Sequence, residues 1–324
     1  MTPAFAITAD GADATAAIGD RLLSLRVTDQ EGITSDRLEI EIDNRDLRVA
    51  MPEHGALLEV SLGFRETGLT RLGSFVVDST GGSGPELRIR IGAKAADMAG
   101  SIRAPKTRAW EDASLEDIVS TIAGEVGLEP VVGDSIKAVR FPFVAQSAES
   151  DLHLLTRLAL PLDATAKPAD GRLLVVRRGE GKTAGGQALK PVAIVPAMLL
   201  SWDFEIADRG LYKSVEAEWA DTGAAETRKV TAGDGTPVRK LRRVFSSETE
   251  AQAAADAALA RSERGVSSLD VELATFEPAL FAGGLVDPKG LGDALAGTWH
   301  LKSVAHVLDG DGLRSEFRAE RGQE

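Results

Sequence analysis

The stretch from Trp110 to Arg178 constrains the fold most, because its hydrophobic spacing differs from that of the sequence on both sides. Before and after it, apolar and polar residues alternate in short runs, which is the period of a half-buried β-strand. Within it, apolar residues recur every three or four positions, which is the period of an amphipathic helix. The sequence therefore predicts a small α/β module with helices, set between two β-rich halves.

Two helices are expected in this module. Ser114 can cap the first, with Asp117 three residues on as in a capping box, and Gly127 is a typical stop. The second is expected to begin near Ser147. It should end at Pro161, because proline lacks the backbone N–H that a helix interior needs.

Residues 1–105 predict a series of short strands, which is the pattern of a barrel or a sandwich. Leu38, Ile40 and Ile42 alternate with acidic residues, which indicates one buried and one solvated face. The glycine-rich segment 81–85 predicts a loop between two of the strands. The strands are expected at 22–27, 38–42, 57–62, 73–77 and 87–91.

Residues 181–324 return to the β pattern after a Gly-, Lys- and Ala-rich segment at 179–190, which we interpret as a link. The polar stretch 227–240 predicts a hairpin. An alanine-rich helix at about 247–263 is expected to pack across a barrel rather than to bind a partner. The strands are expected at 199–206, 214–219, 268–274, 297–308 and 313–319.

The expected organisation is therefore three domains, at 1–105, 106–180 and 181–324. The fold class is α+β and mainly β, with two β domains on either side of the α/β module. A chain of 324 residues is long enough for two or three ordinary cores.

Composition excludes several classes of function. The chain has no cysteine, so it can form neither a disulfide nor a thiolate metal site. It carries 37 basic and 50 acidic residues, a net charge of −13, which does not suit tight binding to a phosphate backbone. No signal peptide and no apolar run of membrane-spanning length is found, so no membrane anchor is expected.

No motif indicates catalysis, a cofactor or a metal. His300 and His306 lie six residues apart on one expected strand, about 20 Å at about 3.3 Å per residue, which is too far for one ion. Gly181-Lys182-Thr183 lacks the preceding glycine of a phosphate-binding loop. Asp309-Gly310-Asp311-Gly312 lacks the further ligands of a calcium loop, so a tight turn is expected. The predicted catalytic, cofactor-binding and metal sites are therefore none.

Three stretches, in this order, resemble the phage late control protein D family, the baseplate hub proteins of contractile tails. The first runs from Trp110-Glu-Asp-Ala-Ser-Leu-Glu-Asp-Ile-Val to Gly127-Leu128, and the second from Gln146-Ser-Ala-Glu-Ser-Asp to Gly171-Arg-Leu. The third joins the region of Phe245-Ser-Ser-Glu to Gly297-Thr-Trp-His and His306-Val. Together they cover about two-thirds of the chain.

The resemblance implies a homotrimer in which each chain supplies two tube-type β-barrels, so that three chains imitate six. Such a ring would join the sixfold tail tube to the threefold central spike and leave a channel through which DNA passes without specific binding. The implied partners are the tail tube or tube-initiator protein, the spike and other baseplate proteins. The implied location is the virion tail baseplate, after assembly in the bacterial cytoplasm, and no catalysis is implied.

Three alternatives stay open from the sequence. One is the equivalent hub of a secretion-type contractile injection system. Another is a cell-wall hydrolase, although every segment is already assigned to a β domain or to the module. The last is a glycan-binding or protein-binding module formed by residues 106–180.

Overall fold

The computed structural model of the protein describes residues 1–31, 36–96, 101–169, 171–179, 181, 187–206, 212–221, 223–264 and 267–321. The fold is α+β and mainly β, as predicted. The chain forms two compact units. The first comprises Met1–Ala99, Pro191–Asp203 and Leu269–Ala319, and the second comprises Gly100–Lys190, Phe204–Ser268 and Glu320–Glu324. The three-domain division at 1–105, 106–180 and 181–324 stays a prediction.

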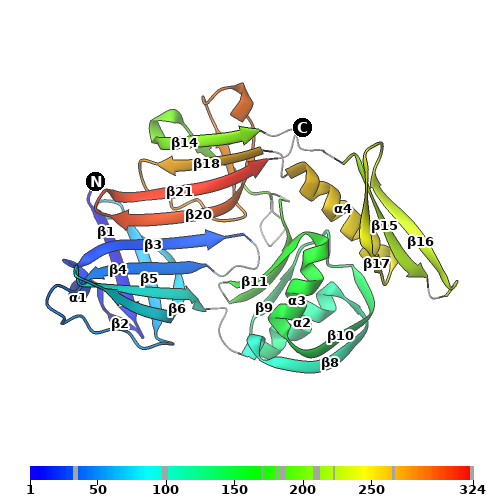
Figure 1. Ribbon diagram of the computed structural model, residues 1–324, viewed down its shortest axis with the longest axis horizontal. Coiled ribbons are helices and arrows are strands. Elements are labelled where there is room, and N and C mark those ends of the chain that lie inside the picture. The colour runs from blue at the N-terminus through cyan, green and yellow to red at the C-terminus, as the bar shows by residue number, and fades with distance from the viewer. Residues whose placement is uncertain are drawn as a thin grey trace. The chain divides into compact units, whose positions relative to one another are not determined.

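One long sheet dominates the first unit (Figure 1). Its strand order is β14-β18-β21-β20-β3-β4-β7-β6-β5-β1-β2, with β13 and β19 off this path, and a short helix α1 (Thr15–Ile18) follows β2. The strands are β1 (Pro3–Ala9), β2 (Ala12–Asp13), β3 (Leu22–Gln30), β4 (Arg37–Asp43), β5 (Leu57–Phe64), β6 (Gly68–Ser83), β7 (Arg88–Ala95), β13 (Val192–Ile194), β14 (Leu199–Ile206), β18 (Ser267–Leu273), β19 (Leu285–Pro288), β20 (Trp299–Asp309) and β21 (Gly312–Arg321).

Eight neighbouring strands of this sheet divide into two groups of four. The first quartet is β3, β4, β7 and β6, and the second quartet is β14, β18, β21 and β20. If the strands of each quartet are numbered by their place in the sequence, both have the spatial order one, two, four, three. The two groups meet where β20 pairs antiparallel with β3, from Ser303 opposite Gln30 to Leu308 opposite Leu25.

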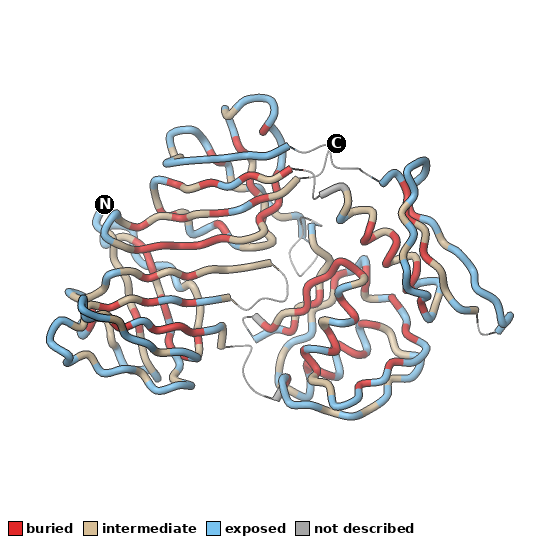
Figure 2. The backbone as a smooth tube through the Cα atoms, viewed as in Figure 1, coloured by how far each residue is buried: buried red, intermediate tan, exposed pale blue. Residues whose placement is uncertain are grey.

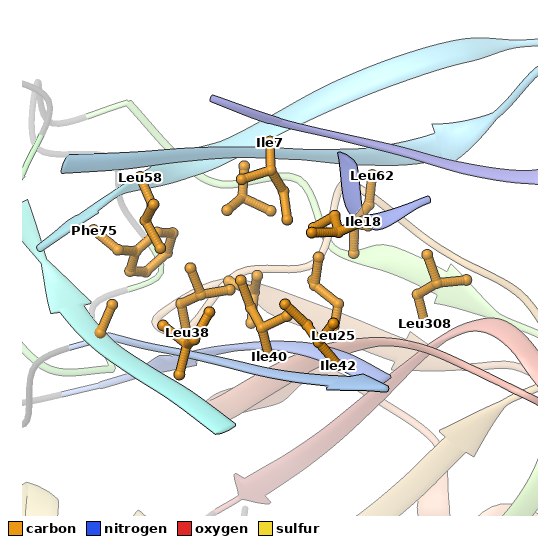
Figure 3. Close-up of a cluster of buried hydrophobic side chains, with 14 of the residues drawn as sticks. Ile7, Ile18, Leu25, Leu38, Ile40, Ile42, Leu58, Leu62, Phe75 and Leu308 are labelled. Carbon is orange, nitrogen blue, oxygen red and sulfur yellow. The ribbon is translucent and has the colours of Figure 1, made fainter. Parts of the chain in front are cut away.

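Each quartet covers a core of its own. In the first core, the sheet turns back through β5 and β1, so that Ile7, Leu58 and Leu62 lie opposite Leu38 and Ile42 (Figure 3). These side chains are at most 3% exposed because alternate residues of every strand point inward. The resulting core is enclosed between two layers of one chain.

The second core lies under β18, β20 and β21 and includes Trp299, Leu269 and Phe317. Val286 of β19 and Ile194 of β13 complete it. Both quartets remain parts of one open sheet, and no closed barrel is found among the described residues. The two tube-type β-barrels that the resemblance implies are therefore not seen as closed barrels, and their strands join in one sheet where β20 pairs with β3.

The segment 81–85 was expected to be a loop, but Gly81, Gly82 and Ser83 belong to β6. They pair with β7, where Ser83 lies opposite Arg88. Glycine lowers intrinsic strand preference, but here pairing with β7 overrides that preference. The loop is therefore shorter than predicted.

The second unit contains the predicted helical module (Figure 1). Ser114 and Asp117 form the capping box of α2, and Gly127 ends that helix at a φ of 72°, both as predicted. The helix α3 begins at Asp151 with Ser150 as its cap, so the expected start at Ser147 is wrong. The elements are β8 (Pro105–Ser114), α2 (Leu115–Val126), β9 (Glu129–Val132), β10 (Arg140–Ser150), α3 (Asp151–Ala159), β11 (Ala164–Ala169) and β12 (Arg172–Arg177).

The same unit holds a small sheet of order β16-β15-β17 and the helix α4 (Glu248–Arg264). The strands are β15 (Ser214–Asp221), β16 (Glu226–Gly233) and β17 (Val238–Phe245). The expected hairpin over 227–240 is wrong, because β16 and β17 flank β15 on opposite sides. The buried face of α4, with Ala251, Ala254 and Ala255, packs on this small sheet and not across a barrel. None of the described helices is both long and apolar enough to cross a membrane.

Candidate assembly surfaces

The two faces of the eight-strand region differ in chemistry. One face carries the two cores. The other, here called the polar face, presents the alternate side chains and forms a depression of about 580 Å³ over the second quartet and β3. Its lining includes Arg26, Asp203, Asp270, Glu272, Glu316 and Arg318.

Positive charges on the polar face are matched by nearby carboxylates. Arg26 lies 2.9 Å from Glu316, and Arg314 lies 2.8 Å from Glu272. Arg314 also bonds Asp309 at 2.9 Å, and this guanidinium holds the pKa of the Asp309 carboxyl below its usual range. Arg314 joins β21 to its neighbours β18 and β20, whereas the Arg26–Glu316 pair reaches across β20 from β3 to β21, so these pairs connect strands of the sheet and neutralise one another.

The strand β14 ends the sheet on one side and is exposed along most of its length (Figure 2). The Ser201 hydroxyl donates to Glu272 at 3.4 Å, so Ser201 belongs to the polar face. Leu200 and Trp202 alternate with Ser201 along this strand. They are 63% and 43% exposed. Two large apolar side chains are thus uncovered on this strand.

The composition of β14 makes its exposure unusual. Edge strands are normally protected against pairing by Lys, Pro, bulges or short length. This strand has eight residues, alternates apolar and acidic or small polar side chains, and contains neither Lys nor Pro. Phe204 and Ile206 extend the exposed apolar row at 39% and 44%. Such an edge is typical of a strand that pairs with another chain.

The other side of the eight-strand region ends at the second half of β6. Pairing with β5 stops at Val76, whereas pairing with β7 continues to Ser83. The loop residues Gly55 and Ala56 bond Val77. Beyond that point, within the part of the chain that the structure describes, Ser79–Ser83 pairs with a strand on one side only. Among the described residues, β14 is thus the last strand at one end of the region, and Ser79–Ser83 is the last segment at the other.

The histidines considered above have structural partners. His300 lies 2.7 Å from Glu31, and His306 lies 2.8 Å from Ser315. Burial raises the pKa of the Glu31 carboxyl, but hydrogen bonding and charge from His300 and Lys302 outweigh this and leave that pKa below its ordinary value. Among the described residues, no group of His, Cys, Asp and Glu side chains could hold a metal ion.

Of the calcium-loop-like and phosphate-loop-like segments, the structure describes the first in full and the second only in part. Asp309–Gly312 is a tight turn between β20 and β21, as predicted, and Asp311 donates its N–H to Asp309 at 2.9 Å. Lys182 and Thr183 lie outside the described residues, so the interpretation of Gly181-Lys182-Thr183 as a link stays a prediction.

Sequence reasoning placed a strand at 199–206 without identifying it as an edge, and it predicted a loop over part of the other edge, Ser79–Ser83. The alternation in Leu-Leu-Ser-Trp-Asp-Phe-Glu-Ile was visible, as was the absence of Lys and Pro. Edge position is not a property of one strand, because it depends on which strand pairs beside it. The only available signal was a long alternating strand without the residues that protect edges.

Two phage proteins are similar to this chain over nearly its whole length. The first is the probable baseplate hub protein of Escherichia phage 186, which is 31% identical over 99% of this chain and 93% of that protein. The second is the probable baseplate hub protein of Escherichia phage P2, which is 28% identical over the same shares. No protein-family model matches the chain.

Solved structures share the fold at lower identity. The 43 kDa tail protein of prophage MuSo2 from Shewanella oneidensis is 15% identical, with a TM-score of 0.70 over 99% of this chain and 98% of that one. A tail protein from Neisseria meningitidis is 14% identical, with a TM-score of 0.71 over 99% and 97%. The c3393 protein of E. coli, a type VI secretion component, is 13% identical, with a TM-score of 0.53 over 94% and 74%.

Proposed function

Because this chain belongs to the family of baseplate hub proteins of P2-like phages, we propose that three copies form a ring at the centre of a contractile-tail baseplate. The observation that carries this proposal is the eight-strand region, whose last described segments are β14 at one end and Ser79–Ser83 at the other. An edge strand exposes unpaired peptide groups that bind another strand. Two different edges on one chain give a head-to-tail contact, which closes into a ring when the rotation fits.

We use the pairing of β20 with β3 inside one chain as the model for strand pairing between two copies. The last strand of the second quartet, β20, pairs with the first strand of the first quartet, β3. By the matching strand order, β6 corresponds to β20 and β14 corresponds to β3. We therefore expect β6 of one copy, over Ser79–Ser83, to pair with β14 of the next.

Burial of the exposed apolar side chains of β14 would supply the apolar part of the contact between copies. Leu200 and Trp202 are exposed and would be buried by the neighbouring copy. Burying a side chain of this size contributes about 1.5–3 kcal/mol, so a few such residues outweigh the cost of ordering the edge. Phe204 and Ile206 add to the same surface.

The size of the resulting ring suits passage of DNA. Eight strands at about 4.8 Å spacing span about 38 Å, so three copies give a circumference of about 115 Å and a diameter of about 37 Å. Strand tilt widens the ring further. The channel is therefore wider than a DNA duplex after side chains are allowed for.

The polar face would line the channel, because the cores and their covering strands occupy the other face. Several of its arginines are paired with carboxylates, such as Arg26 with Glu316 and Arg314 with Glu272. A lining without excess positive charge lets a polyanion pass without tight binding. Each quartet would represent one of the two tube-type domains, so three chains present six similar surfaces to a sixfold tube and a threefold surface to the spike.

A ring at the centre of the baseplate also implies particular partners and a particular role. The partners are the tail tube or tube-initiator protein, the central spike and other baseplate proteins, in the virion tail. The role is structural and not enzymatic. The similar chains of phages 186 and P2 favour a phage-type tail over a secretion-type machine.

Disruption of the β14 surface tests the ring. Leu200→Glu with Trp202→Glu should convert the assembly to monomers, because two charges cannot be buried unpaired at the contact. Mass in solution by light scattering, with electron microscopy for a central hole, measures this. Phe143→Glu, which changes a 58% exposed aromatic on β10, is the control and should leave the assembly intact. An unchanged mass in the double variant contradicts the proposal.

Cross-linking tests the strand pairing itself, since the chain has no cysteine of its own. Ser201→Cys would be combined in turn with Ser79→Cys, Gly81→Cys or Ser83→Cys, all on the polar face. A side chain at Gly81 would contact nothing within 4 Å. One of the three pairs should give a disulfide-linked trimer on a denaturing gel. Only monomers from all three pairs would exclude this junction.

A further inference from the structure

The second unit contains a basic groove of about 690 Å³ between the edge strand β17 and helix α4. Five of its lining residues are cationic and none is acidic. This contrasts with the chain as a whole, whose net charge is −13. We call the site the arginine groove, and its cations are Arg239, Lys240, Arg242, Arg243 and Arg261.

Two of the guanidinium groups are fixed by buried carboxylates. Arg243 lies 2.9 Å from Glu250, whose side chain is 3% exposed. Arg261 lies 3.2 Å from Asp163, whose side chain is 1% exposed, and it also bonds the Leu160 carbonyl at 3.0 Å. Each guanidinium has five N–H donors, so an anchored group keeps donors for a second anion. Anchoring lowers the entropy lost when that anion binds.

The remaining cations are less constrained. Arg239 lies 5.9 Å from the ring of Tyr212, Lys240 lies 3.5 Å from Glu216, and Arg242 is exposed. The side chain of Arg243 is itself 54% exposed. The groove therefore combines two anchored guanidinium groups with cations that no buried carboxylate holds.

The floor between the cations is apolar. Phe245, Ala254 and Ala258 line the groove and are at most 6% exposed as part of the core under α4. Leu241 is partly buried against the same core. A ligand that fits must therefore offer apolar groups beside its negative charges.

Protection of an edge strand does not explain this site. Lys, Arg and a bulge on an edge prevent unwanted pairing, and β17 has both cations and a register shift opposite Glu216–Glu218. That explanation covers the strand alone. It does not account for Arg261, which comes from α4 and is held by a buried carboxylate. The bulge also disfavours a full added strand, so side chains carry the recognition.

Nucleic acid fits the groove less well than protein. A duplex carries one charge for about every 1.7 Å of axis and needs a broad basic surface. Here the cations are confined to one groove, and Glu216 and Glu218 lie on the neighbouring strand β15. An extended peptide with alternating acidic and apolar side chains matches both the cations and the floor.

We propose that the arginine groove docks an extended acidic segment of a partner protein, with its carboxylates on the cations and its apolar side chains on the floor. This inference does not depend on the trimer. The two groups of experiments alter different units of the chain and can fail separately.

Fluorescence anisotropy of the full chain with a short labelled peptide of alternating glutamate and leucine tests the proposal. Binding should weaken by about tenfold or more in Arg239→Glu with Arg242→Glu, because both reversals repel the carboxylates. The anchored Arg243 and Arg261 are left intact to preserve the fold. Arg48→Glu with Arg65→Glu, two exposed residues of the first unit, makes the same charge change and should leave affinity unchanged.

Three further probes define the ligand class. A serine–leucine peptide, an all-glutamate peptide and a single-stranded DNA of equal charge should each bind at least about tenfold more weakly than the glutamate–leucine peptide. Equal binding by the DNA would assign the groove to nucleic acid and overturn the proposal. Absence of glutamate–leucine binding, or equal loss in the Arg48/Arg65 control, would overturn it as well.

Discussion

The two quartets of the long sheet share one strand order but differ in how their cores are covered. The first is enclosed by its own chain, since β5 and β1 turn back over Leu38 and Ile42. The second ends at β14, where Leu200 and Trp202 are exposed. Two quartets with the same strand order can therefore differ in whether their own chain covers them. One half is complete within the chain, and the other has a surface that a neighbouring copy can complete.

The largest expected effects come from the two cores, and they test whether both halves are folded in a single chain. Trp299→Ala and Phe75→Ala should each lower the free energy of unfolding by about 3–5 kcal/mol, because both side chains are at most 2% exposed. Trp299 also donates to the Leu295 carbonyl at 3.0 Å. Urea unfolding of the monomer measures both. A small loss in only one variant would show that its half gains its structure from assembly.

A smaller, pH-dependent effect is expected where a second-quartet strand meets the first core. Burial lowers the pKa of His306 to about 4, and its ring packs against Phe276 at 5.0 Å. The unfolded chain therefore binds a proton between about pH 6.5 and 4 that the folded chain does not. Stability should fall as pH falls through this window, by about 3 kcal/mol at most.

Urea unfolding from pH 7 to pH 4.5 measures this dependence. His306→Gln should remove most of the histidine contribution, whereas His54→Gln, at an exposed position, should retain it. An identical pH profile in wild type and His306→Gln would show that protonation of His306 does not control acid stability.

The polar face gives the next comparison. The Arg314 side chain of the second quartet is 17% exposed and contacts both Asp309 and Glu272, whereas Arg88 of the first quartet is 40% exposed and lies 3.6 Å from Glu41. Arg314→Ala should cost about 1–2 kcal/mol and Arg88→Ala less than about 0.5 kcal/mol, because solvent screens the exposed pair. Thermal unfolding in low salt measures the difference. Equal losses would mean that burial does not distinguish these ion pairs.

The smallest effect on folding is expected at the edge. Trp202→Ser should change the stability of the monomer by no more than about 0.5 kcal/mol, since exposed side chains contribute little to the isolated fold. The same change should weaken the assembly. Unfolding measured at a concentration where the chain is monomeric separates the two effects. A large loss in the monomer would place Trp202 in the core of its own chain.

Local structure followed closely from the sequence. The capping residues Ser114 and Asp117 and the stop at Gly127 were predicted because the hydrogen bonds that cap a helix involve neighbours only. The alternation of β4 likewise predicted its buried face. The start of α3 was misplaced because Ser147 and Ser150 are both suitable caps, and the choice depended on the ladder between β8 and β10 extending to Ser150.

The sequence by itself determined the mainly β class, the helical module, and the resemblance that its motifs carry to hub proteins. Only the tertiary structure decided that β3 pairs with β20, that β16 and β17 flank β15, and that β14 lies at an edge. The physical reason is that period-two alternation fixes which side of a strand is buried. It does not fix which strand lies beside it, because backbone hydrogen bonds are the same for every residue except proline.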